Sequence, residues 1–238
     1  MRPGFLLINK PIGISSFGCI SYLKRIIGKK IKIGHAGTLD PFASGLLIVA
    51  IGRQATRLID SLMKMDKTYV AVGKCGELTD TLDHTGTIIA TTKVIPSQEQ
   101  LQKSFESFGS SYEQIPPLYS ALKHEGKPLY ALMRQQLVNE KDLHAIAQEK
   151  KRIVFLYDKR FIVYNPPFFT IQVTVSSGTY IRTLINDIAT RSGSIATTYQ
   201  LERVKIGPFF LSQAICLDAI HSQEILEQHI IPIENFIQ

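Results

Sequence analysis

The stretch from Gly34 to Leu47 constrains the fold more than any other part of the chain. It contains three glycines and one proline, and it runs into an apolar segment that ends at Gly52. Glycine permits positive φ and close backbone approach, whereas proline fixes its own φ and keeps the preceding residue out of helical geometry. We therefore predict a shaped loop that presents Asp40 and leads into a buried strand over 46–51. Because Asp-Pro is also common in turns, a carboxylate that only caps its own turn stays open.

Size and charge set broad limits on the rest of the chain. Its 238 residues are 45% hydrophobic, which suffices for one large domain or two small ones with a sizeable core. Lys and Arg outnumber Asp and Glu by 27 to 20, an excess that suits a nucleic-acid binder and also occurs in many ordinary enzymes. The three cysteines are far apart without a CxxC pair, which argues against a disulfide framework and fits a reducing cytoplasm. No apolar stretch approaches the ~20 residues of a membrane span.

Hydrophobic periodicity predicts a mixed α/β fold. Period-2 alternation or short apolar runs predict strands over 5–8, 46–51, 66–73, 87–90, 153–157, 161–164 and 169–175. Helical spacing predicts helices over 19–27, 55–63, 97–108 and 181–189, and a further helix beginning at Pro128. Ser15 or Ser16 is expected to cap the first helix, and Ser97 with Gln100 forms a capping-box pattern.

The loop sequence Gly-His-Ala-Gly-Thr-Leu-Asp-Pro-x-Ala-x-Gly-Leu-Leu resembles the signature of the bacterial tRNA pseudouridine-55 synthases. The resemblance extends from Lys10 to about Phe210. It includes Lys-Pro-x-Gly-x-Ser-Ser at 10–16, Lys-x-Tyr at 67–69, Thr-Asp-Thr-x-Asp-x-x-Gly at 79–86, Pro-Pro-x-Tyr-Ser-Ala-x-Lys at 116–123 and Ser-x-Gly-Thr-Tyr-Ile-Arg-Thr-Leu at 176–184. Lys10 could equally be a solvated loop lysine on the sequence alone.

The resemblance implies three catalytic residues. It makes Asp40 the nucleophile, Tyr69 the residue that stacks on the target uracil and acts as a base, and Arg182 the partner of the catalytic aspartate. Apart from the resemblance, Tyr69 is explained by strand packing. If Thr179 is the N-cap, Arg182 lies in the first turn of a helix, where the dipole disfavours a cation without an anionic partner. An arginine that reaches solvent is the alternative.

The resemblance also implies substrate-binding residues, namely His35, Tyr69, Tyr180 and Leu201. His35 would touch the RNA loop, Tyr180 the nucleotide, and Leu201 the base pocket. One departure from the family pattern is Glu202, which replaces the usual first arginine of Leu-Arg-Arg-x-x-x-Gly-x-Phe and puts its contact in doubt.

The implied architecture is one α/β (α+β) catalytic domain over 1–238, with the pseudouridine synthase fold. It has a mixed, largely antiparallel sheet flanked by helices, and a helical thumb is inserted at about 124–152. A surface helical insertion without a role in RNA binding is the alternative for that segment. Residues 216–238 form the tail, and we expect the chain to stop before the PUA-type RNA-binding domain common in relatives.

The implied function is conversion of a T-loop uridine of tRNA to pseudouridine, after the base has been flipped out. No cofactor or metal is expected, because the implied reaction includes no group transfer and no redox step. Asp80, Asp83 and His84 are better explained as turn-capping residues than as metal ligands. The expected partner is the tRNA T stem-loop, without a membrane or protein partner, and the protein is expected to be a cytoplasmic monomer. The basic cluster at 24–32 could meet phosphates or be a solvated face.

Several alternatives stay open at this point. Asp40 could attack C6 of the uracil or C1′ of the ribose. The protein could be a non-catalytic tRNA-binding protein or RNA chaperone, or could modify another RNA. A glycoside-bond hydrolase would need a second carboxylate about 5–10 Å from Asp40, and no motif supplies an obvious one.

Overall fold

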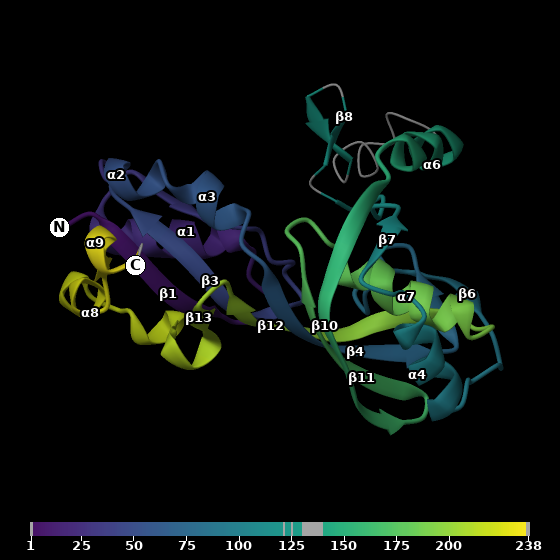
Figure 1. Cartoon of the computed structure of the whole chain (residues 1–238). Coiled ribbons are helices and arrows are strands. Elements are labelled where there is room, and N and C mark those ends of the chain that lie inside the picture. Colours follow the sequence, from purple (N-terminus) through teal and green to yellow (C-terminus); the bar gives the residue numbers. More distant parts are fainter. Residues whose placement is uncertain (1, 121, 125, 130–139, 237–238) are drawn as a thin grey trace. The chain divides into compact units, whose positions relative to one another are not determined.

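The computed structural model describes residues 2–120, 122–124, 126–129 and 140–236 (Figure 1). Internal contacts divide the chain into two compact units. Unit 1 comprises Met1–Tyr69 and Leu201–Gln238, and unit 2 comprises Val70–Gln200. Two strands, β4 (Lys67–Cys75) and β12 (Ala196–Ile206), begin in one unit and end in the other. That the whole chain acts as one catalytic domain stays a prediction.

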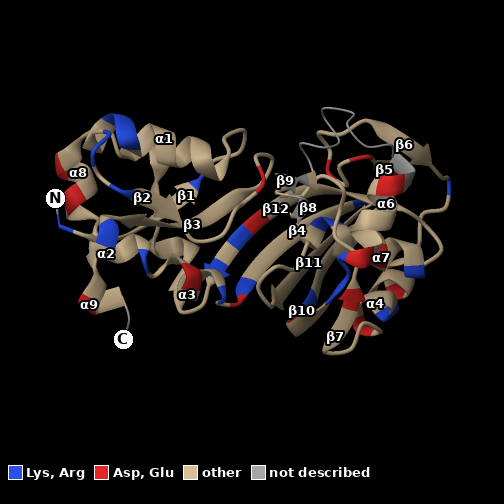
Figure 2. Cartoon of the chain, turned by 90° about the horizontal axis from the view of Figure 1, so that it is seen from above, with Lys and Arg blue, Asp and Glu red and all other residues tan. Residues whose placement is uncertain are grey.

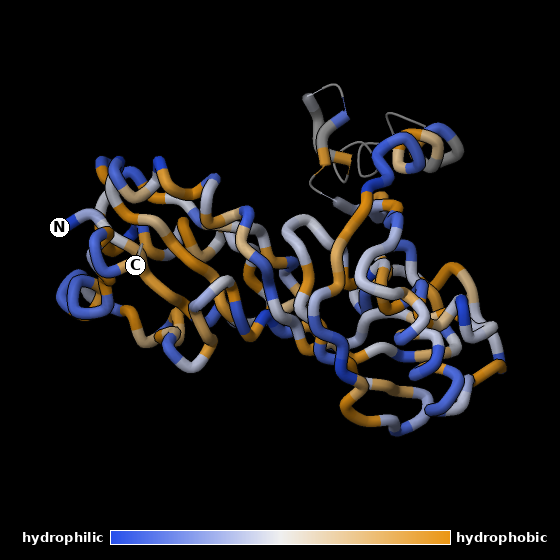
Figure 3. The backbone as a smooth tube through the Cα atoms, viewed as in Figure 1, coloured by the Kyte–Doolittle hydropathy of each residue, from blue (hydrophilic) through white to orange (hydrophobic). Residues whose placement is uncertain are grey.

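Unit 1 is built on two hydrophobic strands, β1 (Gly4–Lys10) and β3 (Ser44–Ile51). They pair antiparallel along their full length, from Gly4 opposite Ile51 to Lys10 opposite Gly45. Figure 3 shows both strands in hydrophobic colours over most of their course. The remaining strands of unit 1 add to this pair: β2 (Ile33–His35), the second part of β12, β13 (Phe209–Phe210), β14 (Ile215–Cys216) and β15 (Ile231–Pro232).

Helices cover both faces of the β1–β3 sheet, which explains why its strands are apolar on both sides. Helix α1 (Ser16–Ile27) packs on one face, with α8 (Gln223–Gln228). The other face is covered by α2 (Arg53–Thr56), α3 (Ile59–Met63) and α9 (Ile233–Phe236). Figure 2 shows α1 and α3 on opposite sides of β1 and β3. Two single 3₁₀ turns, Leu211–Gln213 and Leu217–Ala219, complete the unit.

Local signals fixed the limits of α1. The Ser15 side chain accepts a hydrogen bond from the Gly18 N–H, and the helix ends at Gly28 with φ +85°. The prediction of a single helix over 55–63 was wrong, because the chain forms two short helices there. Between them the Leu58 N–H bonds to the Ala55 carbonyl, three residues back, and this tighter turn interrupts the α-helical ladder.

Unit 2 contains the strand order β4-β11-β10-β7, with β7 at Ser111–Gln114, β10 at Arg152–Asn165 and β11 at Phe168–Val175. Unit 2 also contains two separate two-stranded sheets, β5 (Glu77–Thr79) with β6 (Ile88–Thr91) and β8 (Lys123–His124) with β9 (Lys127–Pro128). Its helices are α4 (Gln98–Glu106), α6 (Glu140–Glu149) and α7 (Ile181–Arg191). The alternation predicted for β11 is confirmed, since Phe169, Ile171, Val173 and Val175 are buried.

The charged segment inside β10 does not form a turn, so the two strands predicted over 153–164 are one. β10 pairs with β11 through register shifts near Asp158 and Ile162 that keep the strand continuous. Asp158 forms an ion pair with Arg160, and Lys159 donates to the Phe105 and Glu106 carbonyls at the end of α4. These contacts satisfy the charges without breaking the strand.

The predicted thumb contains α6, and the capping box of α4 is present as predicted. The helix expected from Pro128 falls largely on 130–139, outside the described residues, and Pro128 itself belongs to β9. Strand β12 was not predicted, although its threonines and valine favour a strand. Among the described residues, no helix is long and apolar enough to span a membrane.

Candidate active site

The predicted site residues are divided between the two units. Asp40, His35, Tyr69 and Leu201 lie in unit 1, whereas Tyr180 and Arg182 lie in unit 2. The pairing of Asp40 with Arg182 therefore joins residues of different units and stays a prediction.

The Asp40 loop follows β2 and is anchored on both sides of the aspartate. The buried Ser16 hydroxyl accepts from the Leu39 N–H at 2.8 Å and donates to the Leu39 carbonyl at 3.1 Å. Lys10 is 0% exposed, and its ammonium donates to the carbonyls of Pro11, Ile14 and Pro41 at 2.7, 2.8 and 3.4 Å. The alternative of a solvated lysine is therefore wrong for Lys10, which holds the residue after the predicted nucleophile.

Arg203 of β12 holds the same loop from a second direction. It is 1% exposed, and its guanidinium donates to the carbonyls of Leu46 at 2.8 Å, Thr38 at 3.3 Å and Gly37 at 3.1 Å. Arg203 pairs with Gly45 across the β12–β3 register. A Cβ on Gly45, where φ is +112°, would lie 2.4 Å from the Arg203 carbonyl oxygen, so only glycine fits. This close approach explains the last glycine of the loop signature.

Buried cations dominate the electrostatics of this loop. Burial lowers the pKa of Lys10 to about 8, while Asp40 is near enough to act in the opposite direction. Burial, with a contribution from Arg203, also lowers the pKa of Lys67 to about 8. The Lys67 ammonium donates to the Met63 and Met65 carbonyls. Lys10 and Arg203 therefore place buried cationic side chains against the main chain of the loop that carries Asp40.

His35 precedes the loop as the last residue of β2. Burial first, and the Arg203 charge second, lower the pKa of His35 below its ordinary value, so the imidazole is neutral near pH 7. Its Nδ1 is buried and has no hydrogen-bond partner among the described residues. Tyr69 and Leu201 are both buried at the points where β4 leaves unit 1 and β12 enters it.

In unit 2, Arg182 is enclosed by acceptors. It is 4% exposed, and it donates to the Tyr119 carbonyl at 2.9 Å and to the Thr81 carbonyl. Its guanidinium lies 3.7 Å from the Asp83 carboxylate, which is also buried. The prediction of an anionic partner is confirmed within the unit by Asp83, and the alternative of an arginine that reaches solvent is wrong. Sequence reasoning missed Asp83 in this role, because it explained this aspartate only as a turn-capping residue.

The start of α7 differs slightly from the prediction. The N-cap is Tyr180 and not Thr179, because the Thr179 hydroxyl donates back to the Ser176 carbonyl and caps nothing. Arg182 still lies in the first turn.

The acidic segment over 76–86, predicted to be a loop, begins with strand β5, and the turn capping predicted for its aspartates is confirmed in the residues that follow. Asp80 accepts from the Thr87 N–H at 2.8 Å, and Asp83 accepts from the Thr85 N–H at 3.0 Å. Within the part of the chain that the structure describes, no three His, Cys, Asp or Glu side chains are placed to hold a metal ion.

This fold, with an aspartate loop anchored between β2 and β3 and a buried arginine at the start of α7, is that of a pseudouridine synthase. The crystal structure of a Cbf5–Nop10–Gar1 complex contains a similar chain, with a TM-score of 0.71 and 26% identity. The match covers 98% of this chain and 60% of that one, so this chain spans about 60% of the length of its structural relative.

Sequence comparisons narrow the class further. A family model described as TruB family pseudouridylate synthase, N-terminal domain, matches residues 24–181. The chain is 38% identical to tRNA pseudouridine synthase B of Protochlamydia amoebophila (strain UWE25), over 96% of this chain and 83% of the relative. It is 39% identical to tRNA pseudouridine synthase B of Chlamydia muridarum (strain MoPn / Nigg), over 93% and 87%. The chain belongs to the TruB family of pseudouridylate synthases, which confirms the resemblance found in the sequence.

Proposed function

We propose that this protein is a tRNA pseudouridine synthase that isomerises the T-loop uridine. The observation that carries the proposal is membership in the TruB family, and it is supported by the presence of Asp40, Tyr69 and Arg182, the residues that the resemblance implies are catalytic. The Asp40 loop is held by the buried Arg203, and Arg182 is itself buried beside Asp83. These buried contacts support a catalytic role for Asp40 and Arg182 over a role as solvated surface residues. A cytoplasmic monomer that acts on the T stem-loop is part of the proposal.

The reaction breaks the N1–C1′ glycosidic bond of uridine and forms a C5–C1′ bond, while C5 loses its proton to solvent and N1 takes up a proton. Atoms and electrons balance without an oxidant, reductant or group donor. In the proposal, Asp40 is the nucleophile, held by a loop whose carbonyls are fixed by Lys10 and Arg203. Attack at C6 of the uracil and attack at C1′ of the ribose both fit these residues.

The target base must leave the folded T loop before it can react, at a cost of a few kcal/mol. Stacking on an aromatic side chain is worth ~1–3 kcal/mol per base, so Tyr69 can offset part of that cost. Leu201 supplies an apolar wall in the proposal, and Tyr69 then takes part in proton transfer. His35, neutral near pH 7, and Tyr180 contact the RNA.

The direct test uses unmodified tRNA transcript labelled with tritium at C5 of uridine. We expect release of about one tritium per tRNA into water, and a single carbodiimide-dependent primer-extension stop in the T loop. Binding without tritium release would identify a non-catalytic tRNA-binding protein or RNA chaperone. A stop outside the T loop, or turnover of a different RNA only, would show that the proposed substrate is wrong.

A further inference from the structure

Gln114, the last residue of β7, has a buried amide that the reaction scheme does not use. It is 1% exposed, and a buried amide is costly unless its polar atoms are paired. Its Oε1 accepts from the Tyr180 N–H at 2.8 Å, and its Nε2 donates to the Tyr180 carbonyl at 3.0 Å. One side chain therefore binds both main-chain polar groups of a single residue, 66 positions further along the chain.

Tyr180 is the place where α7 begins. It is the N-cap, it makes no side-chain cap of its own, and its carbonyl accepts the Leu184 N–H as an intrahelical bond. Helix starts are normally fixed by a Ser, Thr, Asp or Asn at this position. Here the group that holds the helix start is the side-chain amide of Gln114, from strand β7. It acts at Tyr180, two residues before Arg182.

Strand β10 holds Tyr180 as well. Arg152 lies opposite Gln114 in the β7–β10 register, its guanidinium carbon is 5.1 Å from the centre of the Tyr180 ring, and it donates to the Gly178 carbonyl. Gly178 has φ +87°, a conformation that glycine adopts readily. Because glycine has wide conformational freedom, the residue two positions before Tyr180 does not by itself restrict the main chain there. The position of Tyr180 is thus set by contacts from β7 and β10.

The hydrogen bonds around Gln114 have a defined direction. Because the Tyr180 N–H needs an acceptor, Oε1 faces it, and Nε2 must donate to the Tyr112 hydroxyl oxygen on its other side. The Tyr112 proton is then directed to the Asp187 carboxylate, its other partner, on α7 itself. The network ties the start and the middle of α7 to β7.

We propose that Gln114 is a positioning residue for Tyr180 and Arg182 in the pseudouridine reaction, acting through the main chain of Tyr180. The inference rests on the proposed function. Since tRNA affinity depends mainly on phosphate contacts, the loss of Gln114 should slow the chemical step and leave binding largely intact.

The test compares three variants with one control. Gln114→Met removes every hydrogen bond at similar length, and Gln114→Asn keeps the amide but is too short to make both bonds to Tyr180. Tyr112→Phe keeps those bonds and removes only the hydroxyl beyond them. Gln98→Met, an exposed glutamine at the start of α4, is the matched control. The single-turnover tritium release at saturating enzyme, the tRNA Kd and the thermal unfolding midpoint are measured for each.

We expect Gln114→Met and Gln114→Asn to lower the single-turnover rate on the order of tenfold to a hundredfold, with Kd within about threefold. Tyr112→Phe should cost a few-fold, and Gln98→Met nothing. If Gln114 acts through Arg182, the two substitutions are not additive, so Gln114→Asn should lower the rate little further when Arg182→Lys is already present. A general loss of folded protein would instead lower the rate by the same factor in both backgrounds.

Folded Gln114 variants with the wild-type rate would overturn the proposal, and so would a loss confined to Kd. If Gln114→Met does not fold, Gln114→Asn and Tyr112→Phe decide, and wild-type rates in both overturn it. If wild-type protein releases no tritium from tRNA, the proposed function fails, and this inference fails with it.

Discussion

The Asp40 loop of unit 1 and the start of α7 in unit 2 are held in opposite ways. In unit 1, the buried cations Lys10 and Arg203 donate to main-chain carbonyls of the loop. In unit 2, main-chain carbonyls and the Asp83 carboxylate surround the side chain of Arg182, the predicted catalytic arginine. The predicted nucleophile is positioned through the main chain of its loop, whereas the predicted catalytic arginine is held by contacts to its own side chain.

The difference predicts different tolerance to charge-conserving substitution. The Asp40 loop is held by hydrogen bonds that cationic side chains donate to separate main-chain carbonyls. Any cationic side chain that reaches these carbonyls can donate such bonds. A guanidinium between two carbonyls and a carboxylate depends on the fixed fork of its donors, which an ammonium lacks. Lysine should therefore replace arginine more successfully at 203 than at 182.

Among the substitutions that test this comparison, the largest effect is expected for Arg182→Lys. The ammonium keeps the charge but lacks the fixed fork of donors that bonds two carbonyls and a carboxylate, and every ~1.4 kcal/mol added to the barrier is tenfold in rate. We expect the single-turnover tritium release from tRNA to fall at least about a hundredfold. Arg160→Lys, which changes an exposed ion pair on β10, is the control and should be silent. A near-normal rate for Arg182→Lys would remove the distinction between the units.

A smaller effect is expected for Arg203→Lys, about tenfold, because an ammonium can still serve some of the carbonyls of Gly37, Thr38 and Leu46. Arg203→Met should cost more in rate and also lower the unfolding midpoint, since each buried carbonyl left unpaired costs ~1–3 kcal/mol. Glu202→Gln, at the neighbouring position on β12, is the control. Equal losses for Arg203→Lys and Arg182→Lys would contradict the comparison.

The smallest effect is a pH dependence in unit 1. Because burial lowers the pKa of Lys10 to about 8, the side chain becomes neutral above that pH and keeps two N–H donors for three carbonyls. The rate should fall a few-fold as the pH rises past about 8.

The free energy of unfolding should increase over the same pH range. The unfolded lysine keeps its proton up to its ordinary pKa of 10.5, so between about 8 and 10.5 the unfolded state binds more protons and unfolding becomes less favourable as pH rises.

This pH prediction is checked by single-turnover rates and denaturant unfolding of the same samples between pH 7 and 9. Lys10→Arg, which keeps its charge, should lose the alkaline decline in rate. A rate profile that is flat in wild type, or equally steep in Lys10→Arg, would show that Lys10 does not control the loop.

Elements with local signals were predicted well from the sequence. The alternation of β11, the Ser15 cap of α1 and the capping box of α4 all depend on residues within a few positions of each other. The errors came where distant contacts decide. β10 stays continuous through its charged segment because β11 pairs along it and α4 receives Lys159.

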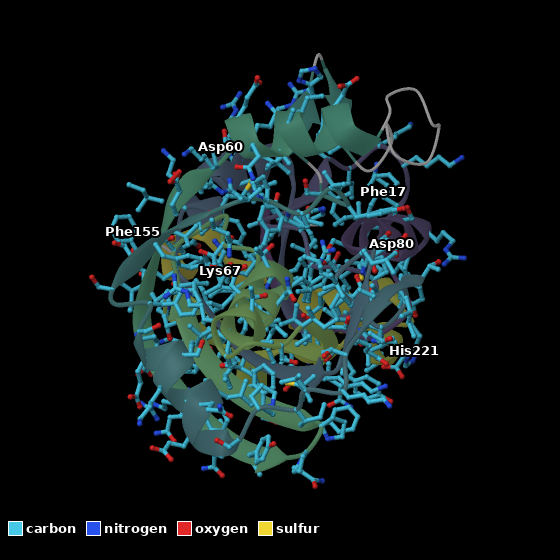
Figure 4. All side chains as sticks on the ribbon, turned by 90° about the vertical axis from the view of Figure 1, so that its right-hand side faces the viewer. Phe17, Asp60, Lys67, Asp80, Phe155 and His221 are labelled. Carbon is cyan, nitrogen blue, oxygen red and sulfur yellow. The ribbon has the colours of Figure 1, made fainter. Side chains whose placement is uncertain are left out.

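The supports of the site were beyond sequence reasoning for the same reason. Lys10 reaches a carbonyl 31 residues away, Arg203 one that is 157 away, and Gln114 one that is 66 away. No local pattern distinguishes these from solvated side chains. The exposed Phe155, which projects from β10 (Figure 4), shows the converse, an aromatic residue outside the core. The functional residues themselves were found through the family motifs, and their roles stay predictions.

The most direct test of the central claim, that Asp40 is the nucleophile, is tritium release by Asp40→Asn under single-turnover conditions, with tRNA binding measured on the same preparation. The amide keeps the shape of the side chain and is a poor nucleophile, and binding depends mainly on phosphate contacts. We predict a tRNA Kd within about threefold of wild type, and no tritium release above the enzyme-free background, with Asp40→Ala giving the same result. Release of tritium with a pseudouridine stop in the T loop from either variant would contradict the account.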